Sequence, residues 1–207
     1  MGVVGAGMKA KKSRQAYGRS RQRRRRAVPW LICLSLLLLA LPILLRAPDA
    51  VQKALHPLRY EAEIRAAAAE HNLEPAFIAG VIYAESRFDP DVQSSPGAYG
   101  LMQVLPDTAT FISERSGITG DYRDPGTNVR MGAWYLSYLH GRYDGDEALT
   151  LAAYNSGEGQ VDSWLSEGRS LPEEIPFQET REYVTNVAEA RDTYASLYGS
   201  NLDGATR

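Results

Sequence analysis

Cysteine and histidine are scarce in this sequence. Cys33 is its single cysteine, so the residues that follow it can form no internal disulfide and offer no thiolate nucleophile. The three histidines, His56, His71 and His140, lack the close spacing of metal ligands. We therefore expect no metal site and no cofactor, and a folded domain here must be stabilised by packing alone.

Acidic residues are absent from the first 46 positions, which carry 11 of the 23 Lys and Arg residues. Residues 47–207 hold the other 12 basic residues and all 25 Asp and Glu residues, for a net charge of −13. A region this acidic repels phosphates at long range, so nucleic acid is not expected as a partner. We interpret its negative charge as a source of ordinary solubility.

A long uncharged segment follows the basic tail. Residues 28–45 are 18 residues without a charge, and a helix of that length, at about 1.5 Å per residue, reaches roughly 27 Å, which suffices for the hydrocarbon core of a bilayer. By the positive-inside rule the run Arg23–Arg26 stays cytoplasmic, near anionic lipid head groups. The sequence thus predicts a disordered basic cytoplasmic tail over 1–27 and a single-pass transmembrane signal-anchor helix over 28–45. The remainder is then extracytoplasmic, in the periplasm or on the outer face.

Three other interpretations of the apolar segment are less favoured. A cleaved signal peptide fits poorly because the basic leader is long and because Ala50 has Pro48 at its minus-three position. A lipoprotein signal fits poorly because Cys33 lies near the start of the apolar run rather than at its end. A buried core helix does not suit the charged flanks.

The remaining residues are expected to form a short spacer over 46–57, one folded domain over 58–200 and a flexible tail over 201–207. Apolar spacing and helix-start signals predict a mainly α fold. Turn signals between Arg87 and Gly100 predict a small β-hairpin or turn region. The expected helices cover 58–71, 76–86, 106–116, 128–143, 147–154, 160–167 and 180–198.

Three short motifs place polar residues where helices should end. They are Glu85-Ser86, Gly100-Leu101-Met102-Gln103 and Ala153-Tyr154-Asn155-Ser156-Gly157. Each alone has an ordinary explanation: a solvated helix-terminal acid, a turn, or a helix C-cap with Asn155 or Gly157 in left-handed geometry. An acid near a helix C-terminus is nevertheless poorly placed against the helix dipole, which raises the carboxyl pKa as a general acid requires.

In this order and spacing the motifs resemble the lytic transglycosylase family, whose soluble-lytic-transglycosylase-like catalytic domain is related to goose-type lysozyme. The resemblance covers roughly residues 60–198 and includes the sequence segments 84–88, 97–103, 157–161 and 179–184. It implies an α+β lysozyme-like fold over 58–200. It also implies cleavage of peptidoglycan glycan strands as the activity.

The resemblance assigns roles residue by residue. Glu85 is the implied catalytic acid, and Tyr99 is a candidate cleft contact. The other implied site residues support or bind the substrate: Ser86 fixes the helix end, Met102 and Gln103 line the cleft wall, Tyr154 and Asn155 bind the sugar next to the scissile bond, and Tyr183 hydrogen-bonds near the Glu85 carboxyl.

A glycosidase normally needs two carboxylates. Asp89 and Asp91 lie near Glu85 in sequence, but around Pro90 they are better explained as turn-forming residues. The family offers a route with one acid, in which Glu85 acts first as acid and then as base and the product carries a 1,6-anhydro ring. Such a residue needs a pKa near the working pH, which a partly apolar pocket of Ile82, Met102 and Tyr183 would provide.

Two alternatives to a lytic transglycosylase stay open at this point. One is a lysozyme-type hydrolase on the same fold, which adds water to the cleaved sugar. The other is a non-catalytic peptidoglycan-binding module.

Overall fold

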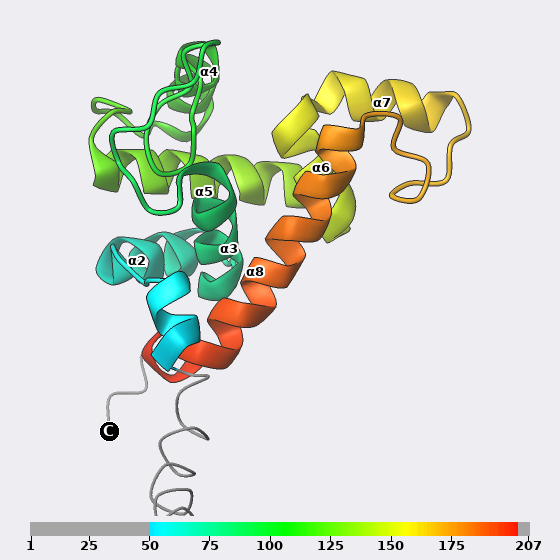
Figure 1. The fold of residues 1–207 in the computed structure, drawn as a ribbon. Helices are drawn as coiled ribbons and strands as arrows, with labels where there is room; N and C mark the ends of the chain where they lie inside the picture. The colour runs from blue at the N-terminus through cyan, green and yellow to red at the C-terminus, as the bar shows by residue number, and fades with distance from the viewer. Residues whose placement is uncertain (1–49, 203–207) are drawn as a thin grey trace, which may run out of the picture. The chain divides into compact units, whose positions relative to one another are not determined.

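The computed structural model describes residues 50–202 (Figure 1). The predicted tail over 1–27 and the predicted spanning helix over 28–45 lie outside these residues. Within 50–202 no helix is both long and apolar enough to cross a membrane. Gln52–Arg207 is one compact unit, and the description below concerns its residues.

The domain is built from helices, as the sequence predicts. Each expected helix is present, with ends shifted by a few residues at most. The helices are α2 (Glu61–His71), α3 (Pro75–Ser86), α4 (Pro106–Ser116), α5 (Pro125–Arg142), α6 (Glu147–Ser156), α7 (Glu158–Ser166) and α8 (Gln178–Leu202). The starts of α2 and α5 differ most from the expected ones, by three residues each. Helix α5 begins before the expected Asn128 because Asp124 caps it by accepting a hydrogen bond from Thr127 N at 2.9 Å.

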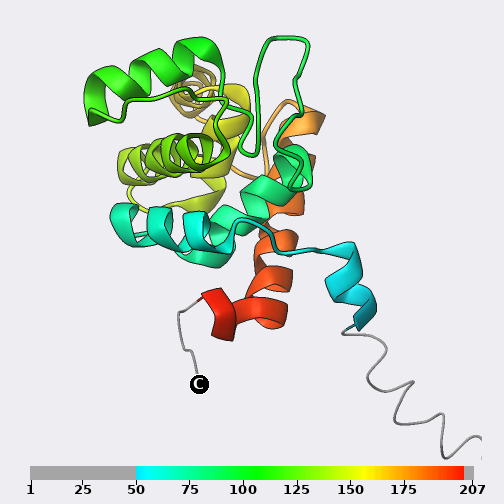
Figure 2. The ribbon, with the colours of Figure 1, turned by 90° about the vertical axis from the view of Figure 1, so that its left-hand side faces the viewer.

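Helix α3 is the central element of the core. Its predicted apolar residues Phe77, Ile78, Val81 and Ile82 are all buried. Helix α8 runs along it, and α2 lies beside α5 (Figures 1 and 2). At Gly80 the approach of α8 leaves no room for a side chain, because a Cβ there would lie 2.9 Å from the backbone nitrogen of Arg191.

The predicted β-hairpin or turn region is a turn segment with two isolated bridges in the described residues. Gln93 pairs with Tyr99, and Tyr99 pairs with Val104. No extended strand forms there because turns at 95–96 and 100–103 leave only single paired residues between them. The described domain is therefore helical with an irregular segment between α3 and α4.

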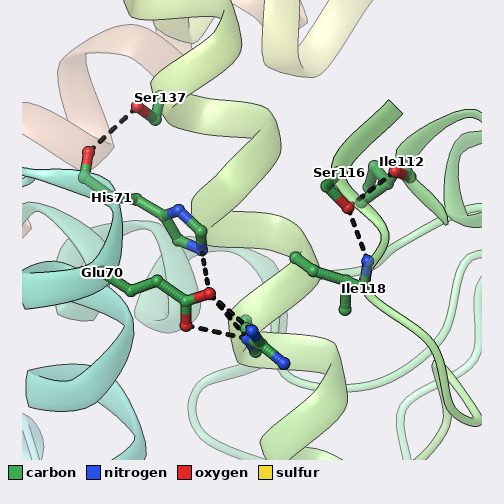
Figure 3. Close-up of polar contacts among 7 residues, drawn as sticks. Glu70, His71, Ile112, Ser116, Ile118 and Ser137 are labelled. Carbon is green, nitrogen blue, oxygen red and sulfur yellow. Dashed lines mark hydrogen bonds and ion pairs between the residues drawn. The ribbon is translucent and has the colours of Figure 1, made fainter. Parts of the chain in front are cut away.

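Helices α2 and α5 are joined by a charged contact. The Arg130 guanidinium donates to both carboxylate oxygens of Glu70 at 2.6 to 3.0 Å. Two turns further along α5, Ser137 Oγ donates to the backbone carbonyl of His71 at 3.0 Å (Figure 3). These contacts fix the C-terminal end of α2 against the middle of α5.

Residues 52–57, which belong to the predicted spacer, contact the folded domain. Tyr194 Oη donates to the Pro57 carbonyl at 3.1 Å, and Tyr198 Oη donates to the His56 carbonyl at 2.9 Å. The His56 ring also lies 4.9 Å from the Tyr83 ring, centroid to centroid. The domain boundary at residue 58 stays a prediction, but the chain is held against α8 before that point.

Candidate active site

Glu85 is the penultimate residue of α3 and is half-buried. Tyr183, on α8, donates from its hydroxyl to Glu85 Oε1 at 2.7 Å. Burial raises the pKa of Glu85 to about 7, and the hydrogen bond from Tyr183 opposes that rise. At neutral pH this carboxyl therefore exchanges a proton readily in either direction, as an acid/base residue must.

Two tyrosines lie near this carboxyl, the buried Tyr183 and the half-exposed Tyr154. Burial, together with the charge of Glu85, raises the pKa values of Tyr183 and Tyr154 well above their ordinary value. Both hydroxyls thus stay neutral and act as hydrogen-bond donors. Tyr183 donates to Glu85, and Tyr154 donates to the Met102 carbonyl at 2.8 Å.

Ser86 joins the end of α3 to the turn that follows Gly100. Its buried hydroxyl lies 3.1 Å from the Ile82 carbonyl oxygen in the preceding helical turn and 2.9 Å from the Leu101 carbonyl oxygen. The next two residues, Arg87 and Phe88, have φ values of 51° and 65°, which turn the chain sharply away from the helix. The position of the Glu85 backbone is thereby tied to the 100–103 turn.

The two predicted residues of that turn have different surroundings. Gln103 is half-exposed, and its amide nitrogen donates to the Val92 and Gly100 carbonyls at 2.9 Å each. Met102 is fully buried, and a Cβ added at Gly132 of α5 would lie 2.5 Å from its sulfur. Met102 therefore contributes to the site through its backbone carbonyl, while its side chain packs in the core.

Asn128 organises this turn, and the sequence analysis missed it. It is fully buried, its Oδ1 accepts from Met102 N at 2.8 Å, and its Nδ2 donates to the Tyr99 and Tyr122 carbonyls at 2.9 and 2.8 Å. An uncompensated amide in the core is costly, so all three bonds matter to the turn. The available signal was an asparagine at an otherwise apolar position of α5.

Asn155, at the end of α6, is half-exposed and anchored from α8. Its Oδ1 accepts a hydrogen bond from the buried Thr180 hydroxyl at 2.8 Å. This contact leaves the Asn155 Nδ2 hydrogens without a protein acceptor among the described residues. Those hydrogens can serve a bound acceptor such as a sugar hydroxyl or an acetamido oxygen.

The carboxylates of Asp89 and Asp91 are engaged in the segment between α3 and α4. Asp89 Oδ1 accepts from Asp91 N at 3.0 Å, and Asp91 Oδ1 accepts from Tyr99 Oη at 3.3 Å. Both contacts are those of turn-forming residues. Within residues 50–202, neither carboxylate contacts Glu85.

Aromatic rings continue the site away from Tyr154. The Tyr135 ring lies 5.7 Å from Tyr154 and 6.1 Å from Tyr138, and Tyr138 stacks on Trp134 at 5.6 Å with an interplanar angle of 9°. All four residues are half-exposed. Their ring faces carry partial negative charge and suit the weakly positive C–H faces of sugar rings.

A known family matches most of this domain. The family model described as "Transglycosylase SLT domain" matches residues 62–175, more than half of the 207 residues. The chain belongs to the transglycosylase SLT domain family. Its relatives include the soluble lytic murein transglycosylase of Escherichia coli strain K12, which is 36% identical over 149 residues. They also include membrane-bound lytic murein transglycosylase C of Histophilus somni, which is 29% identical over 180 residues.

This SLT domain chain corresponds to a fraction of those relatives. The alignments cover 67% of this chain but 23% of the E. coli protein, and 72% of this chain but 50% of the H. somni protein. The chain therefore spans about a quarter to a half of the length of these relatives.

Solved structures share the fold of the SLT domain. An inactive mutant of the lytic transglycosylase Slt from Pseudomonas aeruginosa aligns with a TM-score of 0.64 at 37% identity, covering 68% of this chain and 24% of that one. The 70 kDa soluble lytic transglycosylase of E. coli aligns with a TM-score of 0.67 at 33% identity, covering 72% and 26%. The E. coli enzyme has also been solved in complex with bulgecin A.

Proposed function

We propose that this domain is a peptidoglycan lytic transglycosylase that uses Glu85 as its single acid/base residue. The observation that carries the proposal is the environment of that carboxyl: it is largely screened from water, hydrogen-bonded by Tyr183 and has a pKa of about 7. Within residues 50–202 no second carboxylate hydrogen-bonds to it. One group with a pKa near neutrality can serve as acid and then as base.

The reaction follows from these two protonation states. Protonated Glu85 gives its proton to the glycosidic oxygen between N-acetylmuramic acid and N-acetylglucosamine, and the bond from that oxygen to C1 of the muramic residue breaks. The resulting carboxylate then takes the proton of the muramic C6 hydroxyl while that oxygen bonds to C1. A 1,6-anhydromuramic end forms, Glu85 is again protonated, and water is not consumed.

Other site residues have supporting roles in this proposal. Tyr183 orients the Glu85 carboxyl through its hydrogen bond, and Ser86 holds the helix end beside it. Gln103 and Asn155, together with the ring of Tyr154, offer polar and aromatic contacts to the sugar. Met102 supports the site by accepting the Tyr154 hydroxyl.

The released product tests the proposal. Purified peptidoglycan digested with the protein should give muropeptides that end in 1,6-anhydromuramic acid, one water lighter than those released by a muramidase. Mass spectrometry distinguishes the two products. Reducing muramic ends would identify the domain as a hydrolase, and an absence of any cleavage product would leave a binding module.

We also propose that residues 28–45 anchor the domain in the cell membrane, with the N-terminus cytoplasmic and the domain extracytoplasmic. The support is the uncharged run and the basic tail that precedes it. The full chain should stay in the membrane fraction after carbonate washing and dissolve in detergent. A chain lacking residues 1–45 should not reach the membrane, and full-length protein released by carbonate would contradict the anchor.

A further inference from the structure

A pocket of about 300 Å³ opens between α3 and α8, beside the candidate active site. Polar side chains dominate its lining, among them Tyr83, Arg87, Tyr183, Asn186 and Glu189. Small-molecule sites span about 300 to 1,000 Å³. The pocket therefore has room for a small ligand or for part of a larger one.

The charged groups of this pocket have no ionic partners among residues 50–202. Arg87 lies over the Tyr83 ring at 5.2 Å and donates one hydrogen bond to the Tyr83 hydroxyl at 3.1 Å. Among residues 50–202, no carboxylate lies within 4 Å of its guanidinium. A guanidinium has five N–H donors, so Arg87 retains most of its hydrogen-bonding capacity.

Two side chains of α8 are similarly available. Glu189 and Asn186 are exposed, and within the described residues neither side chain makes a hydrogen bond or an ion pair. The pocket thus offers a cation at one side, and an anion and an amide at the other. A neutral sugar would leave both charges unpaired, whereas a peptide that carries a carboxylate and N–H groups would satisfy both.

The pocket shares a wall with the proposed active site. Tyr183 lines the pocket and also donates to Glu85 Oε1 at 2.7 Å. Ala84, another lining residue, directly precedes Glu85. A ligand group in the pocket is therefore one side chain away from the acid that would act on muramic acid.

We propose that this pocket binds the peptide stem carried by the muramic residue, with Arg87 pairing with a stem carboxylate and Asn186 and Glu189 accepting N–H groups. The proposal rests on the proposed function, because it takes peptidoglycan as the substrate. The stem is attached to the same sugar that would be cleaved, so it leaves the glycan close to Glu85. Arg87 suits this role because its planar fork matches a carboxylate with two hydrogen bonds.

The test compares two forms of one substrate. The wild type and Arg87→Met each digest peptidoglycan strands with intact peptide stems and strands from which an amidase has removed the stems. The methionine keeps an apolar side chain over the Tyr83 ring but removes the charge. We expect the substitution to lower kcat/KM on stem-bearing strands about tenfold through KM, and on stripped strands less than twofold. Arg115→Met is the matched control, because Arg115 also lies over an aromatic ring, that of Phe111, on α4.

A direct binding measurement keeps the proposal testable if stripped strands are poor substrates. The Nε–H signal of Arg87 should shift in NMR spectra when N-acetylmuramyl-L-alanyl-D-glutamate is added to the wild type. The proposal would be overturned if the Arg87 signal of the wild type did not shift. It would also be overturned if Arg87→Met lowered kcat/KM equally on stem-bearing and stripped strands.

Failure of the pocket and failure of the proposed function are distinguishable. If the wild type forms anhydro products and Arg87→Met matches it on stem-bearing strands, only the pocket assignment fails. If the wild type yields no anhydro product from either substrate, the proposed function fails.

Discussion

Glu70 and Glu85 occupy the same place in successive helices, each being the residue before the last of α2 and α3. Their surroundings are opposite. Glu70 is exposed and forms an ion pair with the Arg130 guanidinium, whose hydrogen bonds and charge lower the pKa of the Glu70 carboxyl. Glu85 is half-buried and has a neutral tyrosine hydroxyl as its partner, and burial raises its pKa to about 7.

The surroundings of a helix-terminal glutamate, and not its place in the helix, make it reactive. The helix dipole disfavours a carboxylate at both positions alike, so it cannot separate them. The separation comes from tertiary structure: α8 covers Glu85 with Tyr183, whereas α5 presents an arginine to Glu70. Burial without a counter-charge is the property that fits Glu85 for proton transfer.

The largest expected difference concerns activity. Glu85→Gln keeps the size of the side chain but cannot donate or accept the catalytic proton, so we expect cleavage of peptidoglycan to fall roughly 10³-fold, within the usual range for general acid–base residues. Glu70→Gln should stay within about twofold of the wild type. Muropeptide release measures both, and an active Glu85→Gln protein with a native circular dichroism spectrum would remove Glu85 from its role.

The two glutamates should also affect stability with opposite signs. The pKa of Glu85 is about 7 in the folded protein and 4.5 in the unfolded chain. Between these two pH values the folded protein holds a proton on Glu85 that the unfolded chain has lost. The stability of the wild type therefore falls as pH rises through this range. At pH 8 we expect Glu85→Gln to be more stable than the wild type by up to about 3 kcal/mol, and at pH 4 nearly equal to it.

The pKa of Glu70 is lowered, so its contribution is present above its unfolded value and is lost as pH falls. Glu70→Gln should therefore be slightly less stable than the wild type at pH 8. Urea unfolding at pH 4 and pH 8 measures all three proteins. A Glu85→Gln protein less stable than the wild type at pH 8 would contradict the buried, uncompensated carboxyl.

The neutral partner of Glu85 can be removed separately. Tyr183→Phe deletes the hydrogen bond that lowers the pKa of Glu85, so the pH at which activity falls on the alkaline side should move upward. Loss of orientation should reduce kcat roughly tenfold. Tyr194→Phe is the control, since its hydroxyl contacts the Pro57 carbonyl instead; an identical pH profile in both variants would show that Tyr183 does not tune Glu85.

The smallest effect is expected at the charged partner of Glu70. Arg130→Met removes an exposed ion pair, and such pairs contribute about 0 to 1 kcal/mol to stability. The pKa of Glu70 should return towards its ordinary value, as a carboxyl NMR titration would measure. A rise of the Glu70 pKa to that of Glu85 would mean that burial is not what distinguishes the two residues.

The sequence predicts the helices because their signals are local. Apolar spacing and proline at the first helical position mark α3 and α4, and both begin within one residue of the expected start. The segment between these helices was expected to form a small β-hairpin or turn region, and turn signals alone do not show how few of its residues would pair.

The order and spacing of the motifs predicted the site residues, whereas helix periodicity and propensity did not. The hydrogen bond from Tyr183 to Glu85 joins residues 98 positions apart, and no periodicity predicts such a contact. The role of Asn128 was not predicted for the same reason. Its side chain acts through one donor and two acceptors that only tertiary structure brings to it. The buried side chain of Met102 likewise depends on the space left by Gly132.

The tyrosine contacts of residues 52–57 lie before the predicted start of the domain at residue 58. Tyr194 is fully buried, and its hydroxyl depends on the Pro57 carbonyl, while Tyr198 depends on that of His56. A protein trimmed to begin at Leu58 would lose both acceptors and uncover the rings of α8. The segment 52–57 is therefore held against α8 and is not a free connection to the domain.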